Sequence, residues 1–474
     1  MRVADREPAG ASPSPPNPDD APSPSTIRRV ILASSLGTLF EWYDFYLYGS
    51  LAVFFGELFF PPGNERAALL ASLATFGAGF GVRPLGALVF GRIGDRIGRK
   101  YTFLVTIVTM GVSTALIGFL PTYATIGLWA PLILVTLRLV QGLALGGEYG
   151  GAATYVAEHV PDGRRGYCTS WIQTTATLGF FVSLAVIGAA RSWFGAEDFK
   201  AYGWRAPFLV SFVLLGVSLY VRLRMRESPL FAKLKSEGRV IRNPLKESFG
   251  NPTNLKYVLL ALFGATAGQG VVWYTGQFYA LTFLQKPLNL DWRLAYTIIA
   301  VALALGTPLF VVFGRLSDRI GRKRVMLTGT ALAALSYVPI YHGITLLANP
   351  TLAPKVDSLP LANVAGIVGL VTLQMVWVTM VYGPIAAFLV ELFPTSIRYT
   401  SMSLPYHLGN GWFGGFLPLI ATAITTSAWA NEWLGAGALY AGLAYPIAVC
   451  VMTVVIGGRY LRETKDHRID TPFR

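Results

Sequence analysis

Five charged residues stand inside long apolar stretches of the chain: Glu41, Asp44, Arg83, Arg138 and Glu148. A charge near the centre of a lipid bilayer costs roughly 2.5–3.5 kcal/mol on insertion scales, so each of these side chains is a candidate for function. Three acids and two bases sum to one negative charge, which a single bound proton neutralises. This balance favours chemistry in which a carboxylate takes up and releases a proton.

The acids near residue 44 are spaced so that they act together. Glu41, Asp44 and Tyr48 share one face of a helix, and the helical rise places Asp44 and Arg138 within about one turn of the same depth. A carboxylate stays ionised beside an arginine and binds a proton when it is separated and desolvated. Such a pair suits proton coupling. The alternative is a static ion pair that stabilises helix packing.

Arg83 and Glu148 form a second candidate layer at a common depth. A guanidinium presents a planar fork that binds a carboxylate through two hydrogen bonds, so Arg83 is suited to hold an acidic ligand. The alternative is a permanent ion pair between Arg83 and Glu148. Both interpretations hold together if a ligand competes with Glu148 for Arg83.

Apolar helices must position these charges. Only 14% of the residues are charged, against roughly 25% in a soluble domain, and about 20 apolar residues cross a bilayer as a helix. The sequence predicts an all-α integral membrane protein with about twelve spans, at 29–59, 66–90, 101–120, 127–158, 166–190, 205–223, 256–285, 292–313, 325–347, 361–392, 398–427 and 433–457.

The longest polar break divides these spans into two sets of six. The predicted organisation is a disordered cytoplasmic tail (1–26), an N-terminal six-helix bundle (27–223), a cytoplasmic linker (224–255), a C-terminal six-helix bundle (256–460) and a cytoplasmic tail (461–474).

The distribution of basic residues predicts the orientation. If the N-terminus is inside, 30 of the 39 Lys and Arg residues lie in inner segments and 7 in outer loops, while Arg83 and Arg138 lie within spans. Basic residues concentrate on the cytoplasmic side of membrane proteins. We therefore expect both termini in the cytoplasm, and we interpret the net charge of +14 as a topological signal rather than a nucleic-acid site.

A basic decapeptide occurs twice, as GRIGDRIGRK at 91–100 and GRLSDRIGRK at 314–323. Both copies follow equivalent spans on the inner side, as expected for the internal repeats of secondary transporters. We expect them to form a cytoplasmic gate with acids at the inner ends of the fourth and tenth spans, in which Glu158 and Glu391 pair with Arg96 or Arg99 and with Arg319 or Arg322. The alternative is that they only enforce topology. The expected gate residues are Asp95, Arg96, Arg99, Glu158, Asp318, Arg319, Arg322, Glu391 and Arg398.

These motifs resemble the major facilitator superfamily over nearly all of 27–465. The segments FEWYDFYLYG, GFGVRPLGALVFGRIGD, LRLVQGLALGGEYGGAATYVAEHVP, RESPLF and ELFPTSIRYTS resemble its metabolite:proton symporter family. The resemblance implies two pseudo-symmetric bundles and uptake of small carboxylate-bearing solutes such as shikimate, 2-oxoglutarate, citrate, proline and betaine. It also implies that Asp44 and Arg138 are the proton-coupling pair and that Arg83 anchors a substrate carboxylate.

Polar and aromatic residues in the spans are candidates to complete a substrate site, although each is also a common helix-packing residue. With Arg83 and Glu148, the expected substrate-binding residues are Tyr48, Gln141, Gln173, Trp273, Tyr274, Gln277 and Tyr382. The fifth span contains no Arg or Lys over 171–190, which favours a monocarboxylate such as shikimate or a zwitterion such as proline or betaine.

Other classes of function find no support in the sequence. The dipeptide Gly-Lys is absent, so there is no phosphate-binding loop for ATP. The four histidines have no metal-ligand spacing, and we expect neither an enzyme nor a metal or cofactor, with H⁺ as the coupling ion. The prediction is a monomeric importer in a bacterial inner membrane. Alternatives are an uncoupled facilitator, a dicarboxylate or tricarboxylate symporter, and a transport-inactive sensor of the same fold.

Overall fold

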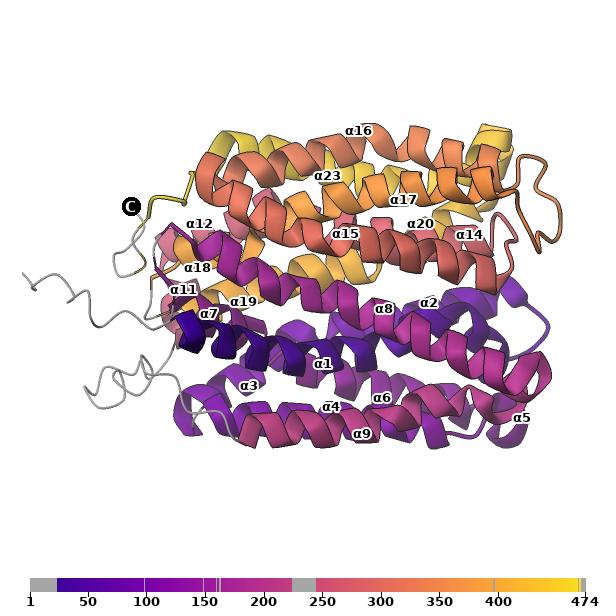
Figure 1. Cartoon of the computed structure of the whole chain (residues 1–474), viewed down its shortest axis with the longest axis horizontal. Coiled ribbons are helices and arrows are strands. Elements are labelled where there is room, and N and C mark those ends of the chain that lie inside the picture. The colour runs from indigo at the N-terminus through magenta and orange to yellow at the C-terminus, as the bar shows by residue number, and fades with distance from the viewer. Residues whose placement is uncertain are drawn as a thin grey trace, which may run out of the picture.

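The computed structural model describes residues 24–97, 99–147, 149–158, 160–161, 163–223, 244–394, 397–467 and 469. Within its helices, the side chains of 24–30, 33, 34, 91–103, 155, 221, 222 and 244 lie outside this description. Over the described residues the chain is helical, and Leu290 and Val356 form an isolated bridge rather than a strand. Figure 1 shows the helices running side by side along one long axis.

The N-terminal half supplies six consecutive rods, two of which are broken in the middle. They are α1 (Pro24–Phe59), α2 (Glu65–Gly81) with α3 (Arg83–Ile97), α4 (Arg99–Phe119), α6 (Trp129–Leu145) with α7 (Tyr149–Glu158), α8 (Arg165–Asp198) and α9 (Arg205–Leu223). The connections include the short turns α5 (Tyr123–Ile126) and η2 (Phe199–Gly203).

The C-terminal half repeats this arrangement. Its rods are α12 (Pro252–Ala261) through η3 (Leu262–Thr266), α13 (Ala267–Tyr274) and η4 (Thr275–Tyr279) to α14 (Ala280–Gln285); α15 (Trp292–Ile320); α16 (Arg322–Ala348); α17 (Leu361–Tyr382) with α18 (Ile385–Leu392); α19 (Arg398–Leu408) through η5 (Gly409–Gly415) to α20 (Leu417–Thr425); and α21 (Ala428–Leu434), η6 (Gly435–Gly437), α22 (Ala438–Ala441) and α23 (Ala444–Tyr460). The predicted fold class is therefore confirmed, and each predicted span overlaps one of these rods, although α8 continues to Asp198 and α15 to Ile320, beyond the predicted ends.

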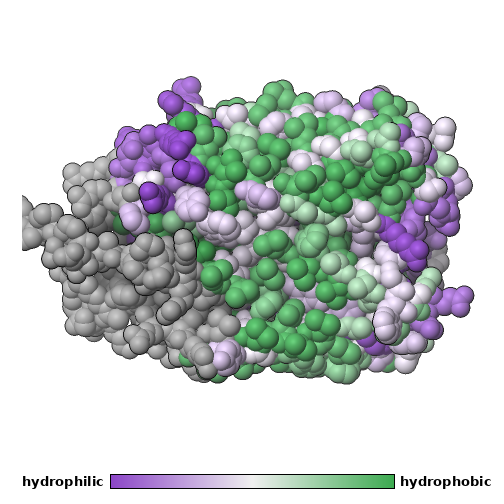
Figure 2. Space-filling model, viewed as in Figure 1, coloured by the Kyte–Doolittle hydropathy of each residue, from purple (hydrophilic) through white to green (hydrophobic). Residues whose placement is uncertain are grey.

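The surface carries an apolar belt. Figure 2 shows hydrophobic residues across the middle of the molecule, with hydrophilic residues at its ends. Among the described residues, seven helices are long and apolar enough to cross a membrane, or eight if one bent pair counts as a single span. Trp129, Trp193, Trp429 and Trp433 are exposed near the ends of their helices, where tryptophan favours the membrane–water interface.

The two ends of the bundle differ. We call the end at which α1 begins and α23 finishes the terminal end, and the other end, with the start of α2 and the end of α14, the opposite end (Figure 1). The described part of the predicted linker contains α11 (Pro244–Gly250) and the start of α12. The described residues of the predicted C-terminal tail lie at the terminal end, where the Thr464 side chain is buried.

The helices nearest the centre approach closely because glycines line their contact. A Cβ atom at Gly142 would collide with the carbonyl group of Gly79, and one at Gly146 would collide with the carbonyl group of Arg83. Small residues let membrane helices pack backbone against backbone. This contact fixes α6 against α2 and α3 and so sets the positions of Arg138 and Arg83.

Candidate functional site

Arg83 stands at a break in a membrane rod. Val82 ends α2 and Pro84 follows Arg83 at the start of α3; proline has no N–H to continue the helical ladder. The Arg83 side chain is fully buried, with its guanidinium carbon 5.1 Å from the Trp42 ring centroid and 5.2 Å from that of Phe80. The break in the helix therefore places the Arg83 guanidinium among aromatic rings in the interior.

The Arg83 guanidinium has no counter-ion among the described residues. None of its three nitrogens has a hydrogen-bond partner, and it forms no ion pair with a described acid. The expected partner Glu148 lies outside the described residues. Because an uncompensated buried charge is strongly unfavourable, this position is suited to an anionic group supplied by a ligand.

Phenol groups from both halves surround Arg83. It interacts electrostatically with Tyr46, Tyr149, Tyr274, Tyr382 and Tyr406. All five are buried. We refer to Arg83 with these tyrosines, Trp42 and Phe80 as the Arg83 site. The predicted substrate residues Tyr274 and Tyr382 thus lie in this site, whereas Trp42 and Tyr149 were not predicted.

Tyr149 and Tyr406 connect the two halves of the chain through a stacked pair of rings. The rings of Tyr149 on α7 and Tyr406 on α19 stack with centroids 3.5 Å apart and planes 2° apart. Gln173 Nε2 donates to Tyr149 Oη at 2.6 Å, and the hydroxyls of Tyr382 and Tyr406 are 2.7 Å apart. Each half therefore contributes one stacked ring that a neighbouring polar residue holds in place.

Further polar groups in the core lack partners among the described residues. They include Trp273 Nε1, both amide atoms of Gln277 and of Gln374, and Gln173 Oε1. Their side chains are buried. Because buried polar groups in proteins are nearly always hydrogen-bonded, each exception calls for an explanation. A polar ligand would satisfy such groups, and Gln173, Trp273 and Gln277 are among the predicted substrate residues.

Arg138 belongs to a separate network within the N-terminal half. Its Nη1 donates to Phe45 O at 3.2 Å and to Gln141 Oε1 at 2.8 Å, and Gln141 Nε2 donates to Thr114 Oγ1 at 2.7 Å. The Tyr48 ring lies 4.7 Å from the Arg138 guanidinium carbon, and the Tyr48 hydroxyl is held by Ser72. Tyr48 and Gln141, both predicted to bind substrate, are thus hydrogen-bonded within this half.

Asp44 is buried beside this network but does not join it. Asp44 and Arg138 are both described, and they form no ion pair; Asp44 Oδ1 has no hydrogen-bond partner among the described residues, and Ser211 on α9 is its polar neighbour. Glu41, one turn earlier, is also buried. Asp44 and Arg138 are therefore not paired in this structure, and their role in proton coupling stays a prediction.

At the terminal end, Glu391 forms ion pairs with arginines from both halves. Arg165 Nη1 and Arg322 Nη2 each lie 3.1 Å from Glu391 Oε1, and Thr464 Oγ1 donates to Oε2 at 2.7 Å. Asp318 accepts from the backbone N–H groups of Gly166 at 2.9 Å and Tyr167 at 2.8 Å, in the first turn of α8. We call Arg165, Asp318, Arg322 and Glu391 the Glu391 cluster.

A reciprocal contact completes the closure of this end. Arg398, at the start of α19, lies 3.4 Å from Glu158 at the end of α7. Arg165 follows Glu158 by seven positions, and Arg398 follows Glu391 by seven positions. Each arginine therefore reaches the acid of the other half, which identifies a repeated Glu-x₆-Arg signal that the sequence prediction missed.

The other predicted gate residues have different outcomes. The side chains of Asp95, Arg96 and Arg99 lie outside the described part of the chain. Arg319 is exposed and forms no ion pair with a described residue, so Arg165 takes the place expected for it beside Glu391. Arg322 contacts Glu391, Asp318 contacts the first turn of α8, and Glu158 contacts Arg398; their role as a gate stays a prediction.

Comparisons with known proteins agree on one class. The sequence model described as Major Facilitator Superfamily matches residues 34–404. The chain is 35% identical to the inner membrane metabolite transport protein YhjE of Escherichia coli over 87% of this chain and 90% of that protein. It is 35% identical to the shikimate transporter of Escherichia coli over 86% and 90% of the two chains.

One more relative and one solved structure are also similar to this chain. The chain is 35% identical to the proline/betaine transporter of Salmonella typhimurium, over 85% of this chain and 78% of that protein. A solved structure of the proton:xylose symporter XylE, bound to 6-bromo-6-deoxy-D-glucose, superposes with a TM-score of 0.71 at 18% identity, covering 94% of this chain and 98% of that one. That structural likeness concerns the fold.

Proposed function

Because the chain belongs to the Major Facilitator Superfamily and is a multi-pass membrane transporter rather than an enzyme, we propose that it is a proton-coupled symporter that imports a small carboxylate-bearing metabolite. Its relatives are named as transporters of metabolites, shikimate, and proline and betaine. We place it in a bacterial inner membrane, which the name of YhjE gives for that relative, with both termini in the cytoplasm, as the positive-inside rule favours.

The substrate class rests on the Arg83 guanidinium, which is buried and has no partner among the described residues. A ligand carboxylate supplies the missing negative charge and matches the planar fork. The tyrosines of the Arg83 site offer hydroxyl groups to the rest of the ligand. The fifth predicted span contains no Arg or Lys over 171–190, which favours a monocarboxylate such as shikimate, or a zwitterion such as proline or betaine, over dicarboxylates and tricarboxylates.

The contrast between the two ends supports transport by alternating access. The Glu391 cluster and the Glu158–Arg398 ion pair close the terminal end across the halves, whereas the opposite end holds a cavity between the halves. Import needs a second arrangement in which these ion pairs break and the opposite end closes. The stacked rings of Tyr149 and Tyr406 join the two halves, so they must also separate.

Asp44 is the proposed proton carrier. Its carboxylate is buried and not paired with Arg138 in this arrangement, so protonation removes an unfavourable buried charge. An approach of Arg138 favours the ionised form and release of the proton. An uncoupled facilitator is the second candidate. The described residues Asp44 and Arg138 form no ion pair, and transport without proton coupling needs no such pair.

Ligand-induced thermal stabilisation of the purified protein tests the substrate class. Shikimate, proline, glycine betaine, 2-oxoglutarate and citrate are compared with methyl shikimate, which lacks the charge. We expect a monocarboxylate or zwitterion to raise the unfolding temperature of the parent protein, and Arg83→Gln to lose that response. Stabilisation by methyl shikimate alone, or an unchanged response in Arg83→Gln, contradicts the assignment.

A further inference from the structure

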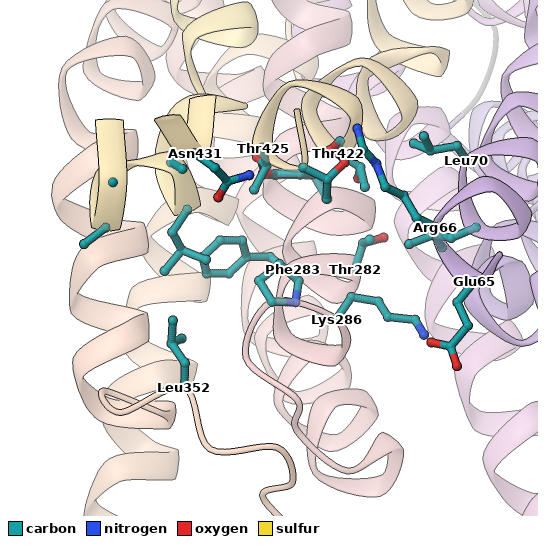
Figure 3. Close-up of a pocket in the computed structure, with 18 residues that line it drawn as sticks. Glu65, Arg66, Leu70, Thr282, Phe283, Lys286, Leu352, Thr422, Thr425 and Asn431 are labelled. Carbon is teal, nitrogen blue, oxygen red and sulfur yellow. Dashed lines mark hydrogen bonds between the residues drawn. The ribbon is translucent and has the colours of Figure 1, made fainter. Parts of the chain in front are cut away.

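The opposite end of the bundle holds a cavity of about 440 Å³ between the two halves (Figure 3). The first turns of α2 form one wall, and the end of α14 with α20 to α22 forms the rest. This volume lies within the range of roughly 300–1,000 Å³ typical of small-molecule sites. Arg83 lies beyond the cavity along α2 and α3, about 20 Å from Leu70 by helical rise, and the rings of Phe76 and Phe80 follow Leu70 on the way.

Two cations from different halves line this cavity. Arg66 lies in the first turn of α2, and Lys286 follows α14. Neither forms an ion pair or a side-chain hydrogen bond with a described residue. Glu65 is the acid on the wall, and Lys286 extends toward it in Figure 3 without forming an ion pair. Two bases and one acid leave the wall with an excess positive charge.

A buried hydroxyl provides an independent observation. Thr422 on α20 lines the cavity, its side chain is 8% exposed, and its Oγ1 has no hydrogen-bond partner among the described residues. An unpartnered hydroxyl at this depth costs free energy that a polar ligand group would recover. The rings of Tyr279 and Phe283 supply an apolar wall beside it. Cation, hydroxyl and ring surface together match a small organic acid.

We propose that this cavity is an outer binding site for a small organic monocarboxylate, in which Arg66 and Lys286 hold the carboxylate and the Thr422 hydroxyl binds a further polar group of the ligand. The proposal rests on the proposed function, because it assigns the cavity the same class of ligand as the Arg83 site. Since its cations belong to different halves, the site exists only while the opposite end is open. It concentrates the ligand on the outer side of the Phe76 and Phe80 rings before the ligand reaches Arg83.

Modification of a cysteine placed in the cavity tests this proposal independently of transport. Leu70→Cys puts a thiol on the wall (Figure 3), and the native Cys168 and Cys450 are buried. The measurement is the rate of modification by an anionic methanethiosulfonate relative to a cationic one. We expect this ratio to fall roughly tenfold when Arg66→Gln and Lys286→Gln are added, because local positive charge raises the encounter rate of anions.

Lys355→Gln is the matched control, because Lys355 pairs with Asp357 on the exposed surface and does not line the cavity. It should leave the ratio unchanged. An equal fall in Lys355→Gln and in the Arg66/Lys286 variant shows a general surface field and overturns the proposal. So does an unchanged ratio in the Arg66/Lys286 variant.

Protection by ligands separates this site from the Arg83 site. Shikimate, proline and glycine betaine are the probes, with methyl shikimate as the uncharged control. We expect at least one carboxylate to slow modification of Leu70→Cys in an Arg83→Gln background and to lose this effect with Arg66→Gln and Lys286→Gln. If protection disappears in Arg83→Gln but survives in the Arg66/Lys286 variant, all binding is at Arg83 and the outer site is contradicted. If no probe protects the thiol, the outer site is also contradicted. If protection persists in Arg83→Gln while no probe is accumulated by vesicles, the outer site stands and the proposed transport function fails.

Discussion

Arg165 and Glu391 form a buried ion pair that crosses the boundary between the two halves, with Arg165 Nη1 3.1 Å from Glu391 Oε1. Arg322 contacts the same carboxylate from the C-terminal half. Removing one member of a buried ion pair costs roughly 3–5 kcal/mol, because the remaining charge is left uncompensated. The closed terminal end therefore depends on Glu391 more than on any surface pair.

Glu391→Gln should shift the protein toward an open terminal end. The arginines lose their shared counter-ion, so the free energy that favours closure falls. Spin labels on exposed residues at the ends of α9 and α15, such as Leu223→Cys and Ile320→Cys, report the separation of the halves by pulsed dipolar spectroscopy. We expect a longer distance in Glu391→Gln and no change in Asp357→Asn, which breaks the exposed pair with Lys355. A distance distribution identical to that of the parent would show that the ion pair does not hold this end closed.

Asp44→Asn should abolish uphill accumulation of substrate while preserving exchange. The amide cannot release a proton, so movement of the empty carrier is no longer tied to a proton gradient, whereas loaded exchange needs no net proton transfer. The measurement compares net uptake with counterflow in the same vesicles. Ser211→Ala alters the polar neighbour of Asp44 without removing the carboxylate and should keep accumulation. Normal uphill uptake in Asp44→Asn would refute the assignment of the proton carrier.

Arg83→Lys and Arg83→Gln should both weaken substrate binding, with the larger effect in Arg83→Gln. Loss of one partner of a buried charge pair costs about 2–5 kcal/mol of binding free energy, and lysine restores the charge but not the planar fork. Equilibrium binding of the labelled substrate measures this order. Lys355→Gln removes a positive charge from the exposed surface and should leave equilibrium binding unchanged. Equal affinity in all variants would exclude Arg83 as the anchor.

Tyr406→Phe and Tyr406→Ala separate the two contributions of the stacked pair. Phenylalanine keeps the stack on Tyr149 but removes the hydroxyl contact with Tyr382, which is worth about 1 kcal/mol. Alanine removes the stack as well and opens a cavity, at a cost of roughly 3–5 kcal/mol. We expect a small loss of thermal stability in the first variant and a large one in the second. Equal losses would assign the contact to the hydroxyl groups alone.

The sequence was sufficient to predict the helices and the depth of their charges, because apolar length and the 1.5 Å rise per residue are local properties. The rotation of a helix about its axis is not local. Asp44 faces Ser211 on α9 instead of Arg138, since depth alone does not decide which neighbour a side chain meets. Similarly, Arg165 rather than Arg319 reaches Glu391, because the partner depends on how the two halves dock.

Uptake of a labelled substrate into vesicles under an imposed pH gradient tests the central claim most directly. The probe is the monocarboxylate or zwitterion that stabilises the purified protein, supplied to right-side-out vesicles with and without an ionophore that collapses the pH gradient and the membrane potential. Proton symport predicts accumulation above the external concentration that disappears when both are collapsed. Accumulation that survives their collapse, or equilibration without accumulation under any gradient, contradicts proton-coupled import.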